Sequence, residues 1–483
     1  MIISGFQPVI GLEVHAQLTT QSKLFCGCET TFGAAPNAQT CPVCLGLPGA
    51  LPVPNEAAIR CAIKLGLALG DHPARTSIFA RKNYFYPDLP KGYQITQFAH
   101  PVVAGGSLSI DLPDGTVKTI AITRAHLEED AGQSSHDGWP QSKTKSYVNL
   151  NRAGTPLLEI VSEPEIHSAE EAQAYLIALR KLVRYIEICD GNMEEGSFRC
   201  DANVSIRPAG STTLGTRTEL KNLNSFNNVR RAIEHEIHRQ ITLVTQGEEV
   251  IQATLLWDVD SQSTRIMRTK EDAHDYRYFP DPDLPPLTVA EEWVAEVARE
   301  IPELPRARYL RFQETFQLSS DDALLLTSEK ELADYFEEVL AHGANPKLAA
   351  NWIKTELLRE MKGLEQGIGK SPISAKQLAG LIALIQDKTI SGKIAKDVFS
   401  EMVVSGKDPE TIVHARGLRQ ITDRAALEAV VARLIADFPD QVAQYREGKS
   451  KVFGFFVGQA MRATKGKANP QLINDLLIHL LSQ

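Results

Sequence analysis

The segment Gly11–Leu18, with the sequence GLEVHAQL, decides the fold because its apolar and polar residues alternate without a break. Side chains alternate between the two faces of a β-strand, so this pattern predicts a strand with one buried face. The apolar residues are Leu12, Val14, Ala16 and Leu18. The opposite face carries Glu13, His15 and Gln17, which places a carboxylate and an imidazole side by side on the first strand.

The composition is that of an ordinary globular protein. The chain has 483 residues, of which 43% are hydrophobic and 23% charged, so it is long enough for about two to four domains. The net charge of -9 argues against wholesale coating of nucleic acid but permits a local basic patch. No apolar run has the length of a membrane span, and the N-terminus lacks the pattern of a secretory signal. We therefore expect a cytoplasmic protein with reduced thiols.

The first part of the chain mixes strand-like and helix-like segments. Strand-like alternation is clearest over residues 199–207, and helices begin after the capping residues Ser168 and Ser225. These segments follow one another without a regular βαβ rhythm. The pattern predicts an α+β fold with a mixed, mostly antiparallel sheet over residues 1–290.

A proline-rich segment at 279–287 precedes a remainder in which apolar residues recur at helical spacing. A second change in the sequence pattern occurs near residues 405–409. We therefore expect an all-α domain over 291–407 and a small helical tail domain over 408–483.

Four of the seven cysteines form two close pairs, which are Cys26, Cys28, Cys41 and Cys44. Thiolates at this spacing can converge tetrahedrally on zinc, so we predict a zinc-binding insertion over residues 26–44. An iron–sulfur cluster also needs four thiolates and is an alternative. Four unrelated buried thiols would be the third interpretation. Because all four ligand positions would be filled, a metal here would be structural.

Carboxylates recur in or beside strand-like segments. Glu159 lies in the apolar run PLLEIV, where a carboxylate is costly unless it is paired or bound to metal. Further acidic residues follow other strand-like runs and include Glu128, Glu129, Asp130, Glu163, Glu194, Glu195 and Asp201. Together with Glu13 and His15, such oxygen ligands and one imidazole suit magnesium or manganese. The alternative is a set of ordinary surface acids, which we favour for Glu165, Glu170 and Glu171.

Two segments interleave basic and aromatic residues. Residues 80–97 contain Lys82, and residues 264–285 contain Arg268 and Lys270. Cations beside magnesium-binding acids suit phosphoryl transfer, because they neutralise charge that develops on the transferred oxygens. The alternative is two polar loops with packed tyrosines. No phosphate-binding loop is present, so a nucleotide would be held mainly through metal and carboxylates.

The C-terminal segment is locally basic. From Gln441 onward six basic residues occur against two acidic ones. The six are Arg446, Lys449, Lys451, Arg462, Lys465 and Lys467. Such a patch attracts a phosphate backbone. The alternative is a solvated helix end over a small aromatic core.

Several longer motifs occur in series. They are VIGLEVHAQL, RKNYFYPDLPKGYQITQ, HLEEDAG, LNRAGTPLLEIVSEP, MEEGSFRCDANVSIR, ELKNLNSF and DYRYFPDPDLPPL. In this order, over nearly the whole chain, they resemble the B subunits of the glutamyl/aspartyl-tRNA amidotransferases, the GatB family. The segment VFGFFVGQAMRATKGKANP is similar to that family's YqeY-like tail.

The resemblance implies a ligase that uses ATP and magnesium to phosphorylate the side-chain carboxylate of glutamate or aspartate mischarged on tRNA. Ammonia then displaces phosphate and gives Gln-tRNA or Asn-tRNA. The resemblance also implies a heterotrimer with an amidase, GatA, that releases ammonia from glutamine, and a small partner, GatC. The catalytic domain would be a cradle like that of glutamine synthetase, and the helical domain and tail would engage tRNA. The choice between Glu-tRNA and Asp-tRNA, and the route of ammonia, stay open.

The resemblance also implies roles for particular residues. The magnesium positions of the family match Glu13, His15, Glu129 and Glu159. These four and Lys82, which matches a basic active-site position, form the expected catalytic set. Zinc-bearing members match at the four cysteines, whereas other members lack them. For the nucleotide we expect Lys82, Arg268 and Lys270. For tRNA we expect Lys451, Arg462, Lys465 and Lys467.

Two other functions fit parts of the sequence. One is a free-standing ATP-dependent carboxylate–amine ligase, which would act without tRNA. The other is a non-catalytic, zinc-bearing tRNA-binding scaffold, which would tolerate the loss of Glu13 or Glu159. The basic tail argues against the first, and the carboxylates on strand faces argue against the second.

Overall fold

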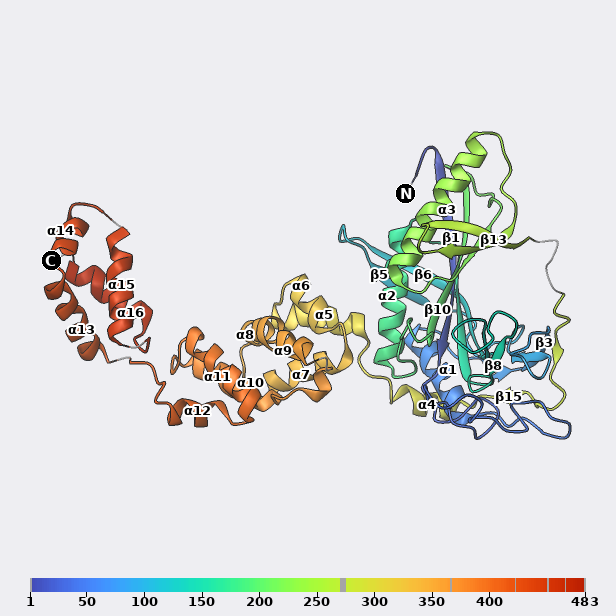
Figure 1. Ribbon diagram of the computed structural model, residues 1–483, viewed down its shortest axis with the longest axis horizontal. Coiled ribbons are helices and arrows are strands. Elements are labelled where there is room, and N and C mark those ends of the chain that lie inside the picture. The colour runs from blue at the N-terminus through green and yellow to red at the C-terminus, as the bar shows by residue number, and fades with distance from the viewer. Residues whose placement is uncertain are drawn as a thin grey trace. The chain divides into compact units, whose positions relative to one another are not determined.

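A computed structural model describes residues 2–269, 275–364, 367–421, 423–449, 451–464 and 466–481. The chain divides into two compact units, Met1–Pro305 and Arg306–Gln483. Figure 1 labels the elements of both units.

The first unit is built on a large mixed sheet. Its strands, with two short pairs that lie outside it, are β1 (Phe6–Gln17), β2 (Thr76–Ser77), β3 (Ala80–Asn83), β4 (Tyr93–Thr96), β5 (Ser107–Asp111), β6 (Val117–Glu129), β7 (Gln133–Ser135), β8 (Tyr147–Asn149), β9 (Pro156–Ser162), β10 (Phe198–Pro208), β11 (Thr218–Lys221), β12 (Ala253–Asp258), β13 (Ser263–Thr269), β14 (Phe279–Pro280) and β15 (Leu287–Thr288). Over the described residues the order along the sheet is β13-β12-β11-β10-β1-β9-β6-β4-β3-β14, and β5 pairs with β6. The pairing of β11 with β12 is parallel, whereas the strands around β1 pair antiparallel. The predicted strand at Gly11–Leu18 lies in β1 up to Gln17, near the middle of the sheet, and the predicted α+β fold is confirmed.

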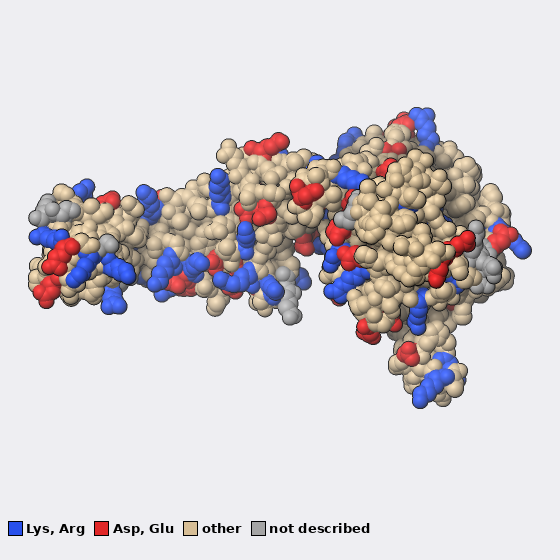
Figure 2. Space-filling view, turned by 90° about the horizontal axis from the view of Figure 1, so that it is seen from above, with Lys and Arg blue, Asp and Glu red and all other residues tan. Residues whose placement is uncertain are grey.

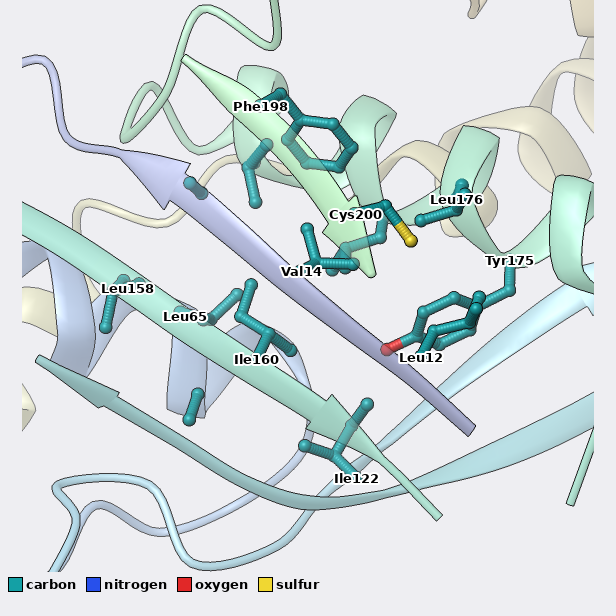
Figure 3. Packing of buried hydrophobic residues seen from close by; sticks show 14 of the residues in the cluster. Leu12, Val14, Leu65, Ile122, Leu158, Ile160, Tyr175, Leu176, Phe198 and Cys200 are labelled. Atoms are coloured by element: carbon teal, nitrogen blue, oxygen red, sulfur yellow. The ribbon is translucent and has the colours of Figure 1, made fainter. Parts of the chain in front are cut away.

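Helices cover one face of this sheet. They are α1 (Glu56–Ala68), α2 (Ala169–Tyr185) and α3 (Phe226–Thr245), and α4 (Glu291–Ala298) packs against α1. Leu12 and Val14 of β1 lie in one buried cluster with Tyr175 and Leu176 of α2 (Figure 3). Cys200 of β10 is 3% exposed in the same cluster, as its place in the alternating pattern predicts. Burying this face leaves the opposite face of β1 for Glu13 and His15.

Two capping serines begin the longer helices at the predicted positions. The Ser168 hydroxyl accepts a hydrogen bond from the backbone N–H of Glu171 at 3.1 Å. The Ser225 hydroxyl accepts one from the backbone N–H of Asn228 at 3.1 Å. Each hydroxyl satisfies an N–H group that has no partner within its own helix, so the two predicted helix starts are confirmed.

The second unit is helical over the residues described. Its elements are α5 (Pro305–Phe316), α6 (Ser320–Leu326), α7 (Lys330–Ala341), α8 (Pro346–Trp352), a π-helical turn (Ile353–Leu357), α9 (Leu358–Gly363), a 3₁₀ turn (Ile368–Lys370), α10 (Ala375–Gln386), α11 (Gly392–Ser405), α12 (Pro409–Ala415), α13 (Arg424–Asp437), α14 (Pro439–Arg446), α15 (Lys451–Ala463) and α16 (Pro470–Leu481). Residues of α5 to α12 form one hydrophobic core, and residues of α13 to α16 form another. The predicted succession of an α+β part and helical parts is confirmed, while the boundaries at residues 290 and 407 stay predictions. No helix in the described ranges combines the length and apolar character that a membrane crossing requires.

Candidate functional site

The face of the sheet opposite the core carries a row of polar side chains. His15 on β1 lies directly opposite Glu159 on β9, and Glu159 lies directly opposite His126 on β6. Residues that are directly opposite in an antiparallel pair point to the same face. Glu128 lies two residues after His126 and therefore also points to this face. We refer to His15, Glu128 and Glu159 as the His–Glu cluster.

The His–Glu cluster has the atoms and the spacing of a cation site. Nε2 of His15 lies 3.5 Å from Oε1 of Glu128 and 3.4 Å from Oε2 of Glu159. One ligand atom from each of the three residues lies within 4.8 Å of the others. Two ligand atoms bound to the same cation at about 2.1 Å lie about 3 Å or more apart. These residues therefore fit a divalent cation with one nitrogen and several oxygen ligands.

In the cluster, neighbouring charges shift the pKa values of His15 and Glu159 against the effect of burial. Burial alone would lower the pKa of His15, but the hydrogen bond with Glu159 and the nearby carboxylate charges raise it to about 9. Burial would raise the pKa of Glu159, but the hydrogen bond with His15, the charge of His15 and the charge of Lys82 hold it well below its usual range. A protonated His15 thus occupies the place between carboxylates that a divalent cation would take.

Glu13 lies beside the cluster. Its Oε1 accepts a hydrogen bond from Nδ2 of Asn203 at 2.8 Å. Burial raises the pKa of Glu13, and the charge of Glu159 raises it further. Glu13 also lines a cavity of about 300 Å³ together with Arg217 and Arg268. Guanidinium groups in such a cavity can bind phosphate oxygens in pairs.

Two basic residues approach Glu159 from other strands. Nη2 of Arg124, on β6, lies 3.8 Å from Oε1 of Glu159. Lys82, on β3, lies close enough for its charge to lower the pKa of Glu159. The Lys82 ammonium also lies 4.9 Å from the centre of the Tyr276 ring, at a distance typical of a cation–π contact. Lys270, the other predicted nucleotide contact, lies outside the described residues.

The structure does not bring Glu129 to the cluster. Its carboxylate accepts hydrogen bonds from the Lys91 ammonium and, at 3.0 Å, from the backbone N–H of Ile95. Glu129 lines a pocket on the side of the cysteine loop, together with Lys23 and Cys44. Adjacent residues of a strand point to opposite faces, so Glu128 supplies the carboxylate beside His15 that we expected from Glu129.

The four cysteines meet as the sequence predicts. Their Sγ atoms lie within 4.8 Å of one another, and those of Cys41 and Cys44 are 3.9 Å apart. Tetrahedral zinc with sulfur at about 2.3 Å places sulfur atoms about 3.8 Å apart, so the thiols fit zinc. The pKa of Cys44 is lowered to about 4. The largest cause is the hydrogen bond with Cys26, followed by the hydrogen bond from the Cys41 N–H and the charge of Lys23. The fit supports a four-thiolate metal site and leaves the choice of metal as a prediction.

Two of the predicted tRNA contacts lie on α15, and a third follows this helix. Lys451 and Arg462 are exposed at the two ends of α15, and Lys467 is half-buried. Lys465 lies outside the described residues. Residues 408–483 contain ten basic and eight acidic residues, and both kinds lie on the visible surface of this part (Figure 2). The basic excess is therefore confined to the segment after residue 440.

Comparison with known proteins assigns this fold and site to a family. The GatB/GatE catalytic domain family matches residues 8–295, and the family described as GatB domain matches residues 334–481. The chain is 56% identical to the B subunit of the aspartyl/glutamyl-tRNA(Asn/Gln) amidotransferase of Geobacter sulfurreducens over 477 residues, 99% of each chain. It is 54% identical to the corresponding B subunit of Desulfotalea psychrophila over 478 residues, 99% of this chain and 100% of the other.

The chain therefore belongs to the GatB family of aspartyl/glutamyl-tRNA amidotransferase B subunits. The family predicted from the sequence motifs is confirmed, and so is the class of enzyme, an amidotransferase.

Proposed function

We propose that this chain phosphorylates the side-chain carboxylate of Glu-tRNA(Gln), Asp-tRNA(Asn) or both with ATP, and then amidates it with ammonia. The observation that supports this most directly is the His–Glu cluster on the polar face of the sheet. Ammonia cannot displace an oxygen from the acyl carbon of a carboxylate until that oxygen becomes part of a good leaving group, and phosphorylation achieves this. The γ-phosphoryl group of ATP is transferred to a carboxylate oxygen with ADP as the leaving group, and ammonia then displaces inorganic phosphate from the acyl carbon.

We propose different tasks for the residues of the polar face. His15, Glu128 and Glu159 would hold magnesium, with Glu128 in the place predicted for Glu129. When bound, the cation would neutralise the anionic substrate and phosphate groups. Lys82 and Arg124 would bind the transferring phosphoryl group, because they bring positive charge to the edge of the cluster.

The neighbouring cavity is the proposed site of the nucleotide. Arg217 and Arg268 would bind phosphate oxygens there, with Glu13 at the wall nearest to the cluster. Lys270, which lies outside the described residues, stays in this proposal from the sequence alone. No protein nucleophile is required, since the substrate carboxylate and ammonia are the nucleophiles.

The proposed assembly follows from the same chemistry. We propose a heterotrimer in the cytoplasm with a GatA-like amidase that supplies ammonia and a small GatC-like partner. The basic residues after residue 440 would bind the tRNA backbone. Structural zinc at the four cysteines would hold the loop of residues 26–44 on the sheet.

Amidation by the assembled complex tests this function. We expect Glu159→Gln and His15→Gln each to reduce amide formation by about a hundredfold or more, with either glutamine or ammonia as nitrogen donor. Glutaminase activity should persist because it belongs to the partner. Glu163→Gln is the matched control, since Glu163 accepts a hydrogen bond from Thr123 at 2.8 Å outside the cluster. Near-normal amidation by both cluster variants would refute the proposed site, and full ATP turnover without tRNA would favour the free-standing ligase.

A further inference from the structure

His126 is a second imidazole on the polar face, beside the His–Glu cluster. Its side chain is 3% exposed, and its Nε2 lies 3.8 Å from Oε2 of Glu128 and 3.7 Å from Oε2 of Glu159. The ring is therefore aimed between the two carboxylates of the proposed cation site. These separations exceed a hydrogen-bond length, so small movements of the side chains would close the contact.

The other nitrogen of this ring decides what His126 can do. Nδ1 is buried and has no hydrogen-bond partner among the residues that the structure describes. A proton on Nδ1 would thus be buried without an acceptor, which is costly. A proton on Nε2 instead faces two carboxylate oxygens. This arrangement favours the tautomer in which Nε2 carries the proton and has no free electron pair for a metal.

Glu128 divides its two oxygens between the two imidazoles. Oε1 lies 3.5 Å from Nε2 of His15, whereas Oε2 lies on the side of His126. A donor that holds Oε2 therefore leaves Oε1 for the cation on the side of His15. Outer partners of this kind orient metal-binding carboxylates and contribute strongly to metal affinity.

We propose that His126 is a positioning residue whose Nε2–H holds the Oε2 atoms of Glu128 and Glu159, so that the cluster is set for the cation. This inference rests on the cation site proposed above. In this role His126 does not contact the cation. Its N–H donor, and not the volume of its ring, orients the two carboxylates.

The test uses the full chain with Mn²⁺ as the probe, followed by pulsed electron paramagnetic resonance. His126→Phe keeps a ring but removes the donor, and we expect it to weaken Mn²⁺ binding about tenfold or more. His126→Gln places an amide N–H near the position of Nε2 and should recover most of the affinity. His167→Phe is the matched control, because His167 hydrogen-bonds to the Pro8 carbonyl and lies outside the cluster. Thermal melting of each variant separates weakened binding from loss of the fold.

The outcomes separate this inference from the proposed function. The wild-type spectrum should show one directly coordinated imidazole, that of His15, and His126→Gln should leave this signal in place. Two coordinated imidazoles would make His126 a ligand and overturn the inference. Equal Mn²⁺ affinity in wild type and His126→Phe would also overturn it, with the cation site intact. A wild-type chain that binds no Mn²⁺ would remove both the cation site and the role of His126.

Discussion

Replacing Glu159 by glutamine should return the pKa of His15 from its raised value toward or below its ordinary one. The pKa of His15 is raised from 6.5 to about 9, and its hydrogen bond with Glu159 is the largest of the contributions that raise it. Glutamine keeps the size and shape of the side chain but removes its charge. Burial, which lowers the pKa of a histidine, then opposes a weaker attraction.

The size of the effect follows from the geometry. Opposite unit charges 3.4 Å apart, the separation of Nε2 of His15 and Oε2 of Glu159, attract by about 5 kcal/mol at an effective dielectric constant of about 20. This corresponds to about 3.5 pKa units. The carboxylate of Glu128, 3.5 Å away, remains in the variant. We therefore expect the pKa of His15 in Glu159→Gln to be about 6 or lower.

The same change alters how stability depends on pH. The folded-state pKa of His15 lies above 6.5, so its contribution to the free energy of unfolding is fully present below pH 6.5. It is lost as the pH rises through about 9. Without bound cation the loss amounts to at most about 3 kcal/mol. Glu159→Gln should remove most of this pH dependence.

The measurement is a nuclear magnetic resonance titration of the full chain, labelled at histidine and without added divalent cation. The His15 signal is assigned by its disappearance in His15→Gln. Glu163→Gln is the control, since Glu163 bonds Thr123 at 2.8 Å and is not among the main influences on His15. A His15 pKa that stays near 9 in Glu159→Gln would show that another group stabilises the protonated ring. The claim that Glu159 raises the pKa of His15 would then be wrong.

The remaining predictions concern the cysteine site and the tail. The full chain should contain one zinc ion, and Cys41→Ser should lose it and melt at a lower temperature; iron, or no metal, in elemental analysis would contradict this. Lys23→Met should speed zinc loss to a chelator about tenfold, because the Lys23 ammonium lies 3.7 Å from Sγ of Cys44 and balances thiolate charge. Lys451→Glu with Lys467→Glu should weaken tRNA binding and reduce the slope of log affinity against log salt by about 0.7 to 0.9 per lost contact; unchanged slopes would show that tRNA is held elsewhere.

Much of the fold could be predicted because its signals are local. Alternation in Gly11–Leu18 and in residues 199–207 indicates strands with one buried face, and both segments lie in central strands of the sheet. Ser168 and Ser225 begin helices because each hydroxyl accepts a bond from a backbone N–H three residues later. The cysteine cluster could be predicted equally well, since its four thiols lie within a segment of 19 residues.

The assembly of the polar face could not be predicted in the same way. His15 and Glu159 meet only because β1 lies between β9 and β10, and β9 follows β1 after more than a hundred residues. Strand order over such separations depends on the packing of the whole core, which no short pattern specifies. The cavity that joins Glu13 to Arg268 likewise needs β11, β12 and β13 in place.

The choice between Glu128 and Glu129 was different, because the sequence contained a local signal that favoured Glu128. Ala125 and Leu127 are fully buried in the core, and Glu129 shares their face by alternation. His126 and Glu128 share the other face, toward His15. Two adjacent carboxylates on β6 thus serve opposite faces of the sheet: Glu129 binds Lys91 on the side of the cysteine loop, and Glu128 faces the proposed cation site. A shift in the register of β6 would disturb both at once, so we expect the order of the cysteine loop and the geometry of the His–Glu cluster to depend on the same strand.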